Sequence, residues 1–264
     1  MSYVHAAGHR LEYKRLRPHD AAARRDLDEA PVLVFLHEGL GSTALWKDFP
    51  QLVADSTGCS ALVYSRHGYG KSDPLTRPRA VDYMHEEALQ TLPQVLASLA
   101  IREPVLIGHS DGASIALIHA GARRWPVRGL VAMAPHVFIE EITLESIAQA
   151  KLTFETTDLA VKLKRYHNDP ASAFRGWNEI WLNPDFRAWN IEEYLPNIEA
   201  PLLLIQGEDD RYGTLAQIRA IARAARGPVR ELILPRCGHS PHVDRKQETL
   251  EAIRDFVAEV KVQR

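Results

Sequence analysis

The sequence predicts an α/β fold, in which a mostly parallel central sheet of roughly eight strands carries helices on both faces. Three observations lead to this class. Apolar, β-rich runs recur along the chain, and stretches of helical character separate them. The runs lack polar alternation, which indicates strands that are covered on both sides. The length of 264 residues is ordinary for one such domain and suffices for a sizeable core.

The first half of the chain follows this alternation closely. Two strand-like stretches flank Gly8-His9, and we expect them to pair as a hairpin before a polar loop at 18–30. The elements that follow are, in order, a strand at 32–36, a helix at 44–56, a strand at 60–64, a helix at 83–100 bent at Pro93, a strand at 104–108, a helix at 113–123 and a strand at 127–134.

Residues 135–195 interrupt the alternation. They have helical character and contain three of the five tryptophans, which suggests a cap over an apolar site. The alternation then resumes with a strand at 201–206, a helix at 215–225, a strand at 229–235 and a terminal helix at 245–260. We therefore predict one core domain made of 1–134 and 196–264, with 135–195 as a helical cap, or lid, inserted after the sixth strand.

Composition and charge restrict the partners and the location. The formal net charge is −2 with both signs interspersed, so we expect no nucleic-acid partner. No apolar stretch approaches the ~20 residues of a membrane span, and the N-terminus has no signal-peptide core, so we expect a cytoplasmic protein without membrane partners. Cys59 and Cys237 are expected to be reduced thiols. The sequence does not indicate the oligomeric state.

A serine between two glycines marks a candidate nucleophile. Residues 108–112 read Gly-His-Ser-Asp-Gly, at the point where a buried strand meets a helix. Such a sharp turn strains the central residue, needs small neighbours, and holds the Ser110 hydroxyl near a helix N-terminus, which favours developing negative charge. The motif alone is weak evidence, but the strand-turn-helix context is the one that the chemistry requires.

A serine nucleophile needs a base and an orienting acid, and later strands offer both. Glu208, Asp209 and Asp210 follow the strand at 201–206, and His239 and His242 follow the strand at 229–235. Carboxyl ends of parallel strands meet at one edge of the sheet, where such side chains can converge. The order serine, acid, histidine is one of the known orders of the catalytic triad.

With these motifs in order, the chain resembles the α/β-hydrolase-fold superfamily of serine hydrolases over nearly its whole length. The stretch HEGLGS (37–42) resembles the oxyanion loop of that superfamily, and RHGYGKS (66–72) resembles its R-G-x-G-x-S turn. The resemblance implies that Asp210, three residues after a glycine, is the acid and that His239, directly after Gly238, is the base. His109 is expected to be structural.

The resemblance also implies an oxyanion hole formed by two backbone amides. We expect one amide from Asp111 and the other from Gly39, with Leu40 as the rival. Glu38 departs from the pattern, because the superfamily has glycine there. Its carboxylate is expected to pair with a neighbouring donor or, alternatively, to bind a cationic or hydroxylated substrate. Asp111 resembles the acid of valacyclovir-type hydrolases that faces a substrate amino group, but capping of the helix or a bond to a nearby loop is the favoured interpretation.

Several further side chains are candidates for substrate binding. Leu40 follows the predicted oxyanion donor, and His136 follows the sixth strand, although an ordinary loop histidine is the alternative there. Aromatic residues of the cap either wall an apolar acyl or aryl site or form the cap's own core; they are Tyr166, Trp177, Trp181, Phe186 and Trp189. Trp177 and Trp181 are the two that we assign to the substrate site.

The predicted function is hydrolysis of an ester-type bond in a small molecule through Ser110, His239 and Asp210. The alternatives are hydrolysis of a carbon–carbon bond, a thioester or a lactone by the same residues, or a ligand-binding protein of this fold without catalysis. Epoxide hydrolysis on this fold normally needs a carboxylate at position 110. We expect no cofactor and no metal, because the sequence contains neither a dinucleotide fingerprint nor metal-ligand spacing.

Overall fold

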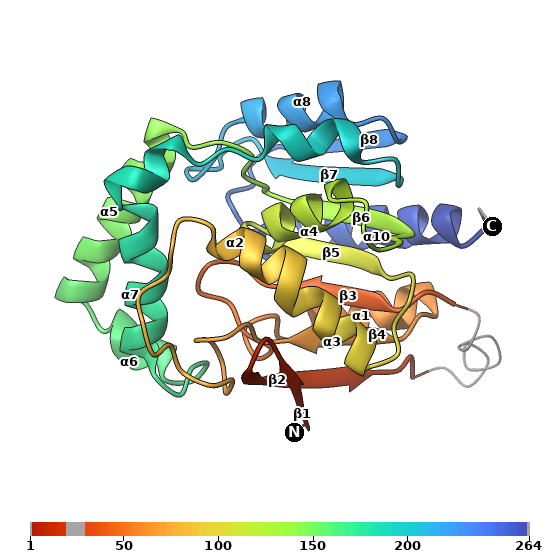
Figure 1. Ribbon diagram of the computed structural model, residues 1–264. Helices are drawn as coiled ribbons and strands as arrows, with labels where there is room; N and C mark the ends of the chain where they lie inside the picture. The colour runs from red at the N-terminus through yellow and green to blue at the C-terminus, as the bar shows by residue number, and fades with distance from the viewer. Residues whose placement is uncertain (1, 20–29, 263–264) are drawn as a thin grey trace.

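The computed structural model describes residues 2–19 and 30–262, and an eight-stranded sheet forms the centre of this part of the chain (Figure 1). The strand order is β1-β2-β4-β3-β5-β6-β7-β8; β1 and β2 join antiparallel, and the neighbours from β4 to β8 are parallel. The strands are β1 (Ser2–Ala6), β2 (His9–Leu16), β3 (Leu33–Leu36), β4 (Ala61–Tyr64), β5 (Val105–His109), β6 (Gly129–Met133), β7 (Leu202–Gly207) and β8 (Val229–Leu234). The predicted fold class is confirmed.

Helices cover both faces of the sheet. One face packs against α1 (Phe49–Thr57) and α10 (Lys246–Val262). The other face packs against α2 (Tyr83–Glu86), the π-helix η2 (Glu87–Thr91), α3 (Leu92–Ser98), α4 (Asp111–Gly121) and α8 (Leu215–Ala224). A short helix, α9 (Pro241–Asp244), lies between β8 and α10.

Strand periodicity explains why two apolar layers form. In β3, Val34 and Leu36 face the layer under α4, whereas Leu33 and Phe35 face the layer under α1. All four side chains are buried. Successive side chains of a strand point to opposite faces, so alternate residues pack against opposite helix layers. Burial of each such side chain contributes about 1.5–3 kcal/mol.

The segment between β6 and β7 is largely helical. It contains α5 (Glu141–Thr156), α6 (Leu159–Leu163), α7 (Pro170–Trp181), η3 (Pro184–Ala188) and η4 (Glu192–Asn197). In Figure 1, α5, α6 and α7 lie beyond the carboxyl ends of the parallel strands. The segment closes on itself, since Phe138 and Asn190 form a β-bridge and the amide of Ile191 donates to the carbonyl of Val137 at 2.8 Å. The division into a core and a cap at 135–195 stays a prediction.

Some element boundaries differ from those expected. The helix predicted at 44–56 begins only at Phe49, because Lys47 has a positive φ of 54° and Trp46 turns into the core. The helix predicted at 83–100 is interrupted before Pro93 by η2, and this wider turn accommodates the proline ring, which clashes with regular helical geometry. Of the loop predicted at 18–30, residues 20–29 lie outside the described residues.

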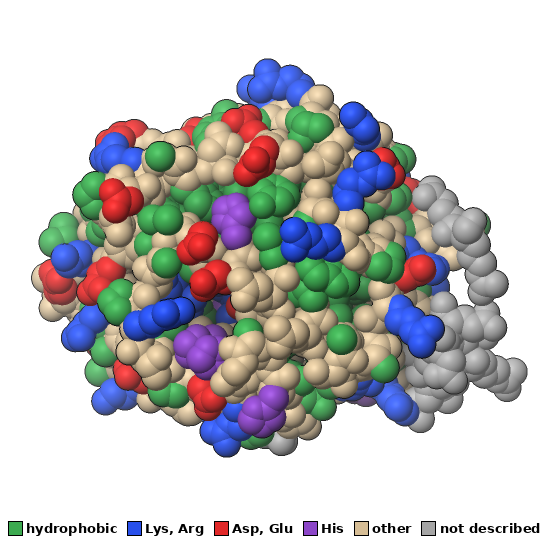
Figure 2. All heavy atoms as spheres, viewed as in Figure 1, with side chains coloured by type: hydrophobic (Ala, Val, Ile, Leu, Met, Phe, Trp, Pro, Cys, Tyr) green, Lys and Arg blue, Asp and Glu red, His purple; other side chains and the backbone are tan. Residues whose placement is uncertain are grey.

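The surface of the described chain carries both signs of charge. On the face in Figure 2, Lys and Arg side chains lie among Asp and Glu side chains rather than in one block. In residues 2–19 and 30–262, none of the helices combines the length and apolar character needed to cross a membrane.

Candidate active site

The nucleophile elbow joins β5 to α4, and close packing explains its two glycines. A methyl group built at Gly112 would lie 2.0 Å from the carbonyl oxygen of Leu36, and one at Gly108 would lie 2.4 Å from the carbonyl oxygen of Gly112. Ser110 between them has φ 53° and ψ −120°, the strained conformation expected for this turn. This backbone conformation points the Ser110 hydroxyl away from the sheet and places it at the N-terminus of α4.

The three side chains predicted as a triad meet at the carboxyl end of the sheet. His239 Nε2 lies 2.9 Å from Ser110 Oγ, and His239 Nδ1 lies 2.8 Å from Asp210 Oδ2. Two further donors hold the carboxylate of Asp210: the amide of Tyr212 at 2.8 Å and Nε2 of Gln206 at 2.7 Å. With an N–H from Nδ1 to the carboxylate, the lone pair of Nε2 accepts the serine proton, as general-base catalysis requires.

Burial and these hydrogen bonds oppose one another at Asp210. Burial alone would raise the pKa of this carboxyl, but its contact with His239 and the amide of Tyr212 lower the pKa below the ordinary value of 3.8. The neighbouring acids Glu208 and Asp209 are exposed. His242 packs against Trp46 and Phe49, with ring centroids 4.9 Å and 5.4 Å away. Asp210 and His239 are thus the acid and the imidazole that reach Ser110.

The loop after β3 passes beside Ser110. Gly39 lies under the indole of Trp177, and a methyl group built at this glycine would be 2.2 Å from Trp177 Nε1. The amides of Gly39, Leu40 and Asp111 donate to no backbone oxygen among the turn, loop and cap hydrogen bonds of the described residues. These amides are therefore available to a ligand, but Gly39 and Leu40 remain rivals for the second oxyanion donor.

The side chain of Asp111 points away from the cavity. Its carboxylate accepts a hydrogen bond from the Tyr83 hydroxyl at 2.7 Å and lies 3.5 Å from the Arg66 guanidinium. Trp181 Nε1 donates to the same Tyr83 oxygen at 3.1 Å. The contact with Arg66 is the bond to a nearby loop that the sequence favoured, and Asp111 is not among the residues that line the cavity.

Glu38 forms the second unusual contact. Its Oε2 lies 3.5 Å from Nδ1 of His109, and only 21% of the Glu38 side chain is exposed. Burial would raise the pKa of Glu38, but the nearby imidazole of His109 holds that pKa well below its ordinary value. The pKa of His109 is raised, because the effect of Glu38 outweighs burial. The neighbouring group that faces the Glu38 carboxylate is therefore His109.

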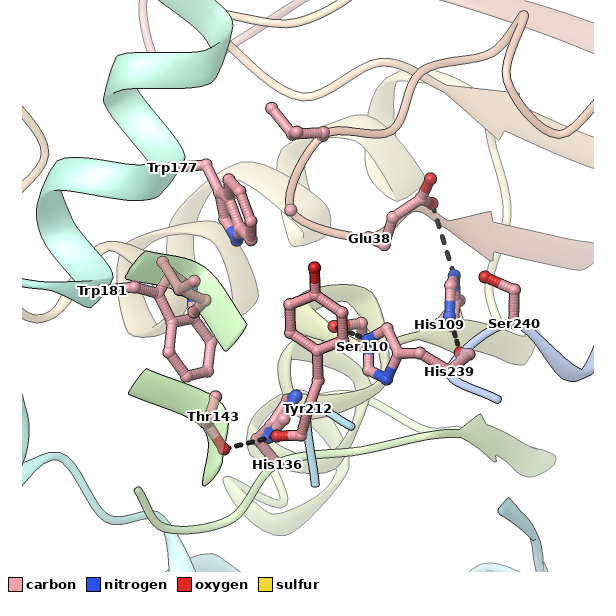
Figure 3. Close-up of a pocket in the computed structure, with 13 residues that line it drawn as sticks. Glu38, His109, Ser110, His136, Thr143, Trp177, Trp181, Tyr212, His239 and Ser240 are labelled. Atoms are coloured by element: carbon pink, nitrogen blue, oxygen red, sulfur yellow. Dashed lines mark hydrogen bonds and ion pairs between the residues drawn. The ribbon is translucent and has the colours of Figure 1, made fainter. Parts of the chain in front are cut away.

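A cavity of about 230 Å³ opens beside Ser110 (Figure 3). Its walls come from the loop after β3, the elbow at Ser110, the segments after β6 and β7, helices α5 and α7, and the loop after β8 that carries His239, here called the histidine loop. The lining residues are Glu38, Gly39, Leu40, His109, Ser110, His136, Thr143, Ile147, Trp177, Trp181, Tyr212, His239 and Ser240. In Figure 3 the hydroxyl of Tyr212 points into the space between Ser110 and Trp177.

The predicted substrate-site residues therefore line one cavity, and the other cap aromatics do not. Phe186 and Trp189 pack with Trp181, at centroid distances of 5.2 Å and 6.3 Å, within the aromatic core of the insertion. Tyr166 is not among the lining residues. His136 is buried 5.0 Å from the Trp181 ring, and burial followed by the charge of His239 lowers its pKa to about 3. His136 is consequently a neutral imidazole at neutral pH.

Sequence reasoning missed five lining residues: His109, Thr143, Ile147, Tyr212 and Ser240. The sequence contains a signal for Thr143 and Ile147, because residues four apart in a helix lie on the same face. Tyr212 has a weaker one, as it follows the acid by two residues. His109 was expected to be structural because it lies beside the serine, and only the folded chain brings it to the cavity.

Residues 2–19 and 30–262 contain no group of three or more His, Cys, Asp or Glu side chains arranged to hold a metal ion.

Comparison with known proteins defines the class. The sequence profile of the alpha/beta hydrolase family matches residues 33–252, and the chain belongs to this family. It is 26% identical over 267 residues to "Epoxide hydrolase 3" of Xenopus tropicalis, covering 87% of this chain and 72% of that protein. It is 24% identical over 259 residues to "2-(acetamidomethylene)succinate hydrolase" of Mesorhizobium japonicum, covering 88% and 90%.

A solved structure agrees with this assignment. The crystal structure of proline iminopeptidase from Mycobacterium smegmatis matches 99% of both chains with a TM-score of 0.74 at 19% identity, which shows the shared fold. The named relatives are hydrolases of different bonds. They support hydrolase activity for this chain and leave the bond to the chemistry of the site.

Proposed function

We propose that this protein is a serine hydrolase that cleaves an ester-type bond in a small, uncharged molecule. One observation carries the proposal: an unbroken hydrogen-bonded chain runs from Asp210 through His239 to the Ser110 hydroxyl, beside a cavity. An imidazole that is oriented by a carboxylate converts an adjacent serine from a weak nucleophile into a strong one.

The reaction follows from these contacts in two halves. Ser110 Oγ attacks the carbonyl carbon while His239 takes its proton, and the amides of Asp111 and Gly39 stabilise the resulting oxyanion. His239 then gives the proton to the leaving alcohol, and an acyl-serine remains. In the second half, His239 removes a proton from water, the hydroxide attacks the acyl carbon, and the carboxylic acid leaves as Ser110 recovers its proton.

The size and the lining of the cavity favour a small and uncharged substrate. Its volume of about 230 Å³ is below the ~300–1,000 Å³ that is usual for drug-sized ligands. Leu40, Ile147 and two tryptophans supply apolar wall, which suits a short acyl chain or a single aryl ring. No Lys or Arg is among the described residues that line the cavity, and Glu38 is already paired with His109. The site therefore offers no obvious partner for a charged substrate.

The same three residues also serve hydrolysis of a carbon–carbon bond, a thioester or a lactone, which is the second candidate. Epoxide hydrolysis, the activity that the name of the Xenopus relative states, is not proposed, because Ser110 stands where a carboxylate nucleophile is expected. We further propose that residues 135–195 act as a cap, since Trp177, Trp181 and Ile147 of this segment line the cavity. A cytoplasmic location stays a prediction.

A substrate screen tests the function. We expect p-nitrophenyl esters of short acyl or aryl acids to be hydrolysed, and long acyl chains and anionic esters to be poor substrates. Ser110→Ala abolishes this activity, and substitution of an exposed serine in α3, Ser98→Ala, serves as the control. Turnover of a vinylogous diketone, a thioester or a lactone in preference to every ester would favour the second candidate. Binding of a ligand without any turnover would favour the non-catalytic alternative.

A further inference from the structure

A buried acid–histidine pair links three segments of the site. Glu38 lies in the loop after β3, next to Gly39, and its Oε2 is 3.5 Å from Nδ1 of His109. His109 lies in the nucleophile elbow, next to Ser110, and its Nε2 is 2.7 Å from the backbone oxygen of His239. Each residue in this series of contacts is thus a candidate catalytic residue or the direct neighbour of a residue proposed to act in catalysis.

The hydrogen-bond partners determine where the protons of His109 lie. A carbonyl oxygen only accepts hydrogen bonds, so the short contact to His239 requires a proton on Nε2 of His109. The other nitrogen, Nδ1, faces a carboxylate, and its bare lone pair would repel that group. A shared proton resides on the imidazole rather than the carboxyl, since imidazole is ordinarily the stronger base by about two pKa units. His109 is therefore a doubly protonated imidazolium facing a carboxylate.

The fold makes room for this pair. A methyl group built at Gly41 would lie 2.5 Å from Glu38 Oε2, so only glycine leaves space for the carboxylate in this position. The backbone oxygen of Glu38 is fixed as well, because it accepts hydrogen bonds from His37 Nδ1 at 2.7 Å and from Arg66 at 2.9 Å. The acid thus leaves a rigid loop in a defined direction, toward His109.

We propose that Glu38 and His109 form a carboxylate–imidazolium pair that acts as a positioning device, holding the oxyanion loop, the nucleophile elbow and the histidine loop in register. This inference rests on the proposed serine-hydrolase function. Neither side chain takes a chemical step; Glu38 acts through His109, and His109 acts through the backbone of His239. The glutamate that replaces the superfamily's glycine thus has a structural partner of its own.

Other titratable groups face His109 from the surrounding elements. They are Asp210 after β7, His136 after β6, the ring of His239 after β8, and His242 of α9. Asp210 already pairs with His239, and burial keeps His136 and His242 neutral by lowering the pKa of each to about 3. Glu38 is therefore the acid available to hold the second proton of His109.

Nitrogen NMR of the full chain, with ¹⁵N-labelled histidine, tests the pair without reference to activity. At about pH 8, where an ordinary histidine is neutral, His109 is expected to carry protons on both ring nitrogens in the wild type. In the isosteric variant Glu38→Gln it is expected to carry only the Nε2 proton, and Glu103→Gln, at the opposite end of β5, is expected to leave it doubly protonated. The spectrum of His109→Gln identifies which signals belong to His109. If that variant does not fold, Glu38→Gln alone tests the pair, because the spectrum must then show one histidine that has lost one ring proton. A neutral His109 in the wild type, or one unaffected by Glu38→Gln, overturns the pair.

Kinetics test the positioning role. On the best p-nitrophenyl ester, Glu38→Gln and His109→Gln are each expected to lower kcat about tenfold while KM changes little, as for a loss of alignment. The double variant is expected to equal His109→Gln alone, because Glu38 acts through His109. Losses that multiply, or variants with full kcat, overturn the positioning role alone. A wild-type chain that neither turns over an ester nor reacts with a fluorophosphonate overturns the proposed function as well, whereas the NMR result still reports on the pair.

Discussion

The guanidinium of Arg66 lies 3.5 Å from the carboxylate of Asp111, and both side chains are almost completely buried. Arg66 also donates to the backbone oxygens of His37 and Glu38, at 3.3 Å and 2.9 Å. The one side chain thus connects the loop that carries Gly39 to the first residue of α4. These two segments carry the proposed oxyanion donors, the amides of Gly39 and Asp111.

Arg66→Met should therefore destabilise the fold. The substitution leaves the buried carboxylate of Asp111 without its charged partner, and breaking a buried pair costs about 3–5 kcal/mol. Urea unfolding at neutral pH measures the loss. Arg230→Met is the control, because Arg230 and Glu259 form an exposed pair worth at most about 1 kcal/mol. Equal, small losses in both variants would contradict the structural role of Arg66.

Gly39→Ala should lower activity, because the added methyl group would overlap the indole of Trp177. The loop must shift, and we expect kcat to fall about tenfold or more, equivalent to about 1.4 kcal/mol of lost transition-state stabilisation. The double variant Gly39→Ala, Trp177→Ala should recover part of this loss, since the obstacle is then absent. If the second substitution recovers nothing, the contact does not cause the defect.

Trp177→Ala should widen the range of accepted acyl chains. The indole forms part of the cavity wall, and its removal adds space on the acyl or aryl side of the site. The ratio of kcat/KM for long and short p-nitrophenyl esters should rise. Trp125→Ala provides the comparison, because Trp125 follows α4, stacks on His119 and does not line the cavity. An unchanged ratio in Trp177→Ala would contradict the assignment of this residue to the substrate site.

The pH dependence of stability should contain a contribution from His242. Burial, followed by the charge of His109, lowers its pKa from 6.5 to about 3, so its stabilising contribution is complete above pH 6.5. As pH falls from 6.5 toward 3, the unfolded chain binds a proton that the folded chain does not, and the free energy of unfolding decreases. The slope is at most about 1.4 kcal/mol per pH unit for this group.

His242→Leu removes this titration. The difference in unfolding free energy between about pH 7 and about pH 5 should shrink by up to about 2 kcal/mol in urea experiments. His5→Leu, on the exposed side of β1, serves as the matched control. The same pH dependence in His242→Leu and in the wild type would show that the imidazole is not held neutral.

Most of the fold was predictable because its signals are local. Continuous apolar runs such as the one that became β3 have few alternatives to a covered parallel strand. Boundaries were less accurate where tertiary packing overrides propensity. Trp46 turns into the core and delays α1, and the wide turn η2 forms ahead of Pro93. Neither the direction of a buried side chain nor a local change of helical pitch is determined by the pattern of apolar residues.

The site was predictable where a motif fixes the backbone. Close packing at the turn requires the glycines on either side of Ser110. The acid and the histidine follow strands that end at the same edge of the sheet. Side-chain partners across the fold were not predictable. The hydrogen bond between Asp111 and Tyr83 and the ion-pair contact between Glu38 and His109 join elements far apart in sequence, which only the folded chain brings together.

The central claim is that Ser110 is a nucleophile activated by His239, and covalent labelling tests it most directly. A fluorophosphonate probe should add one equivalent to the intact protein by mass spectrometry, with the added mass on the peptide that contains Ser110. Ser110→Ala should add none, and His239→Gln should react far more slowly while remaining folded. A wild-type chain that stays unlabelled at high probe concentration, or a label that persists in Ser110→Ala, would contradict the account.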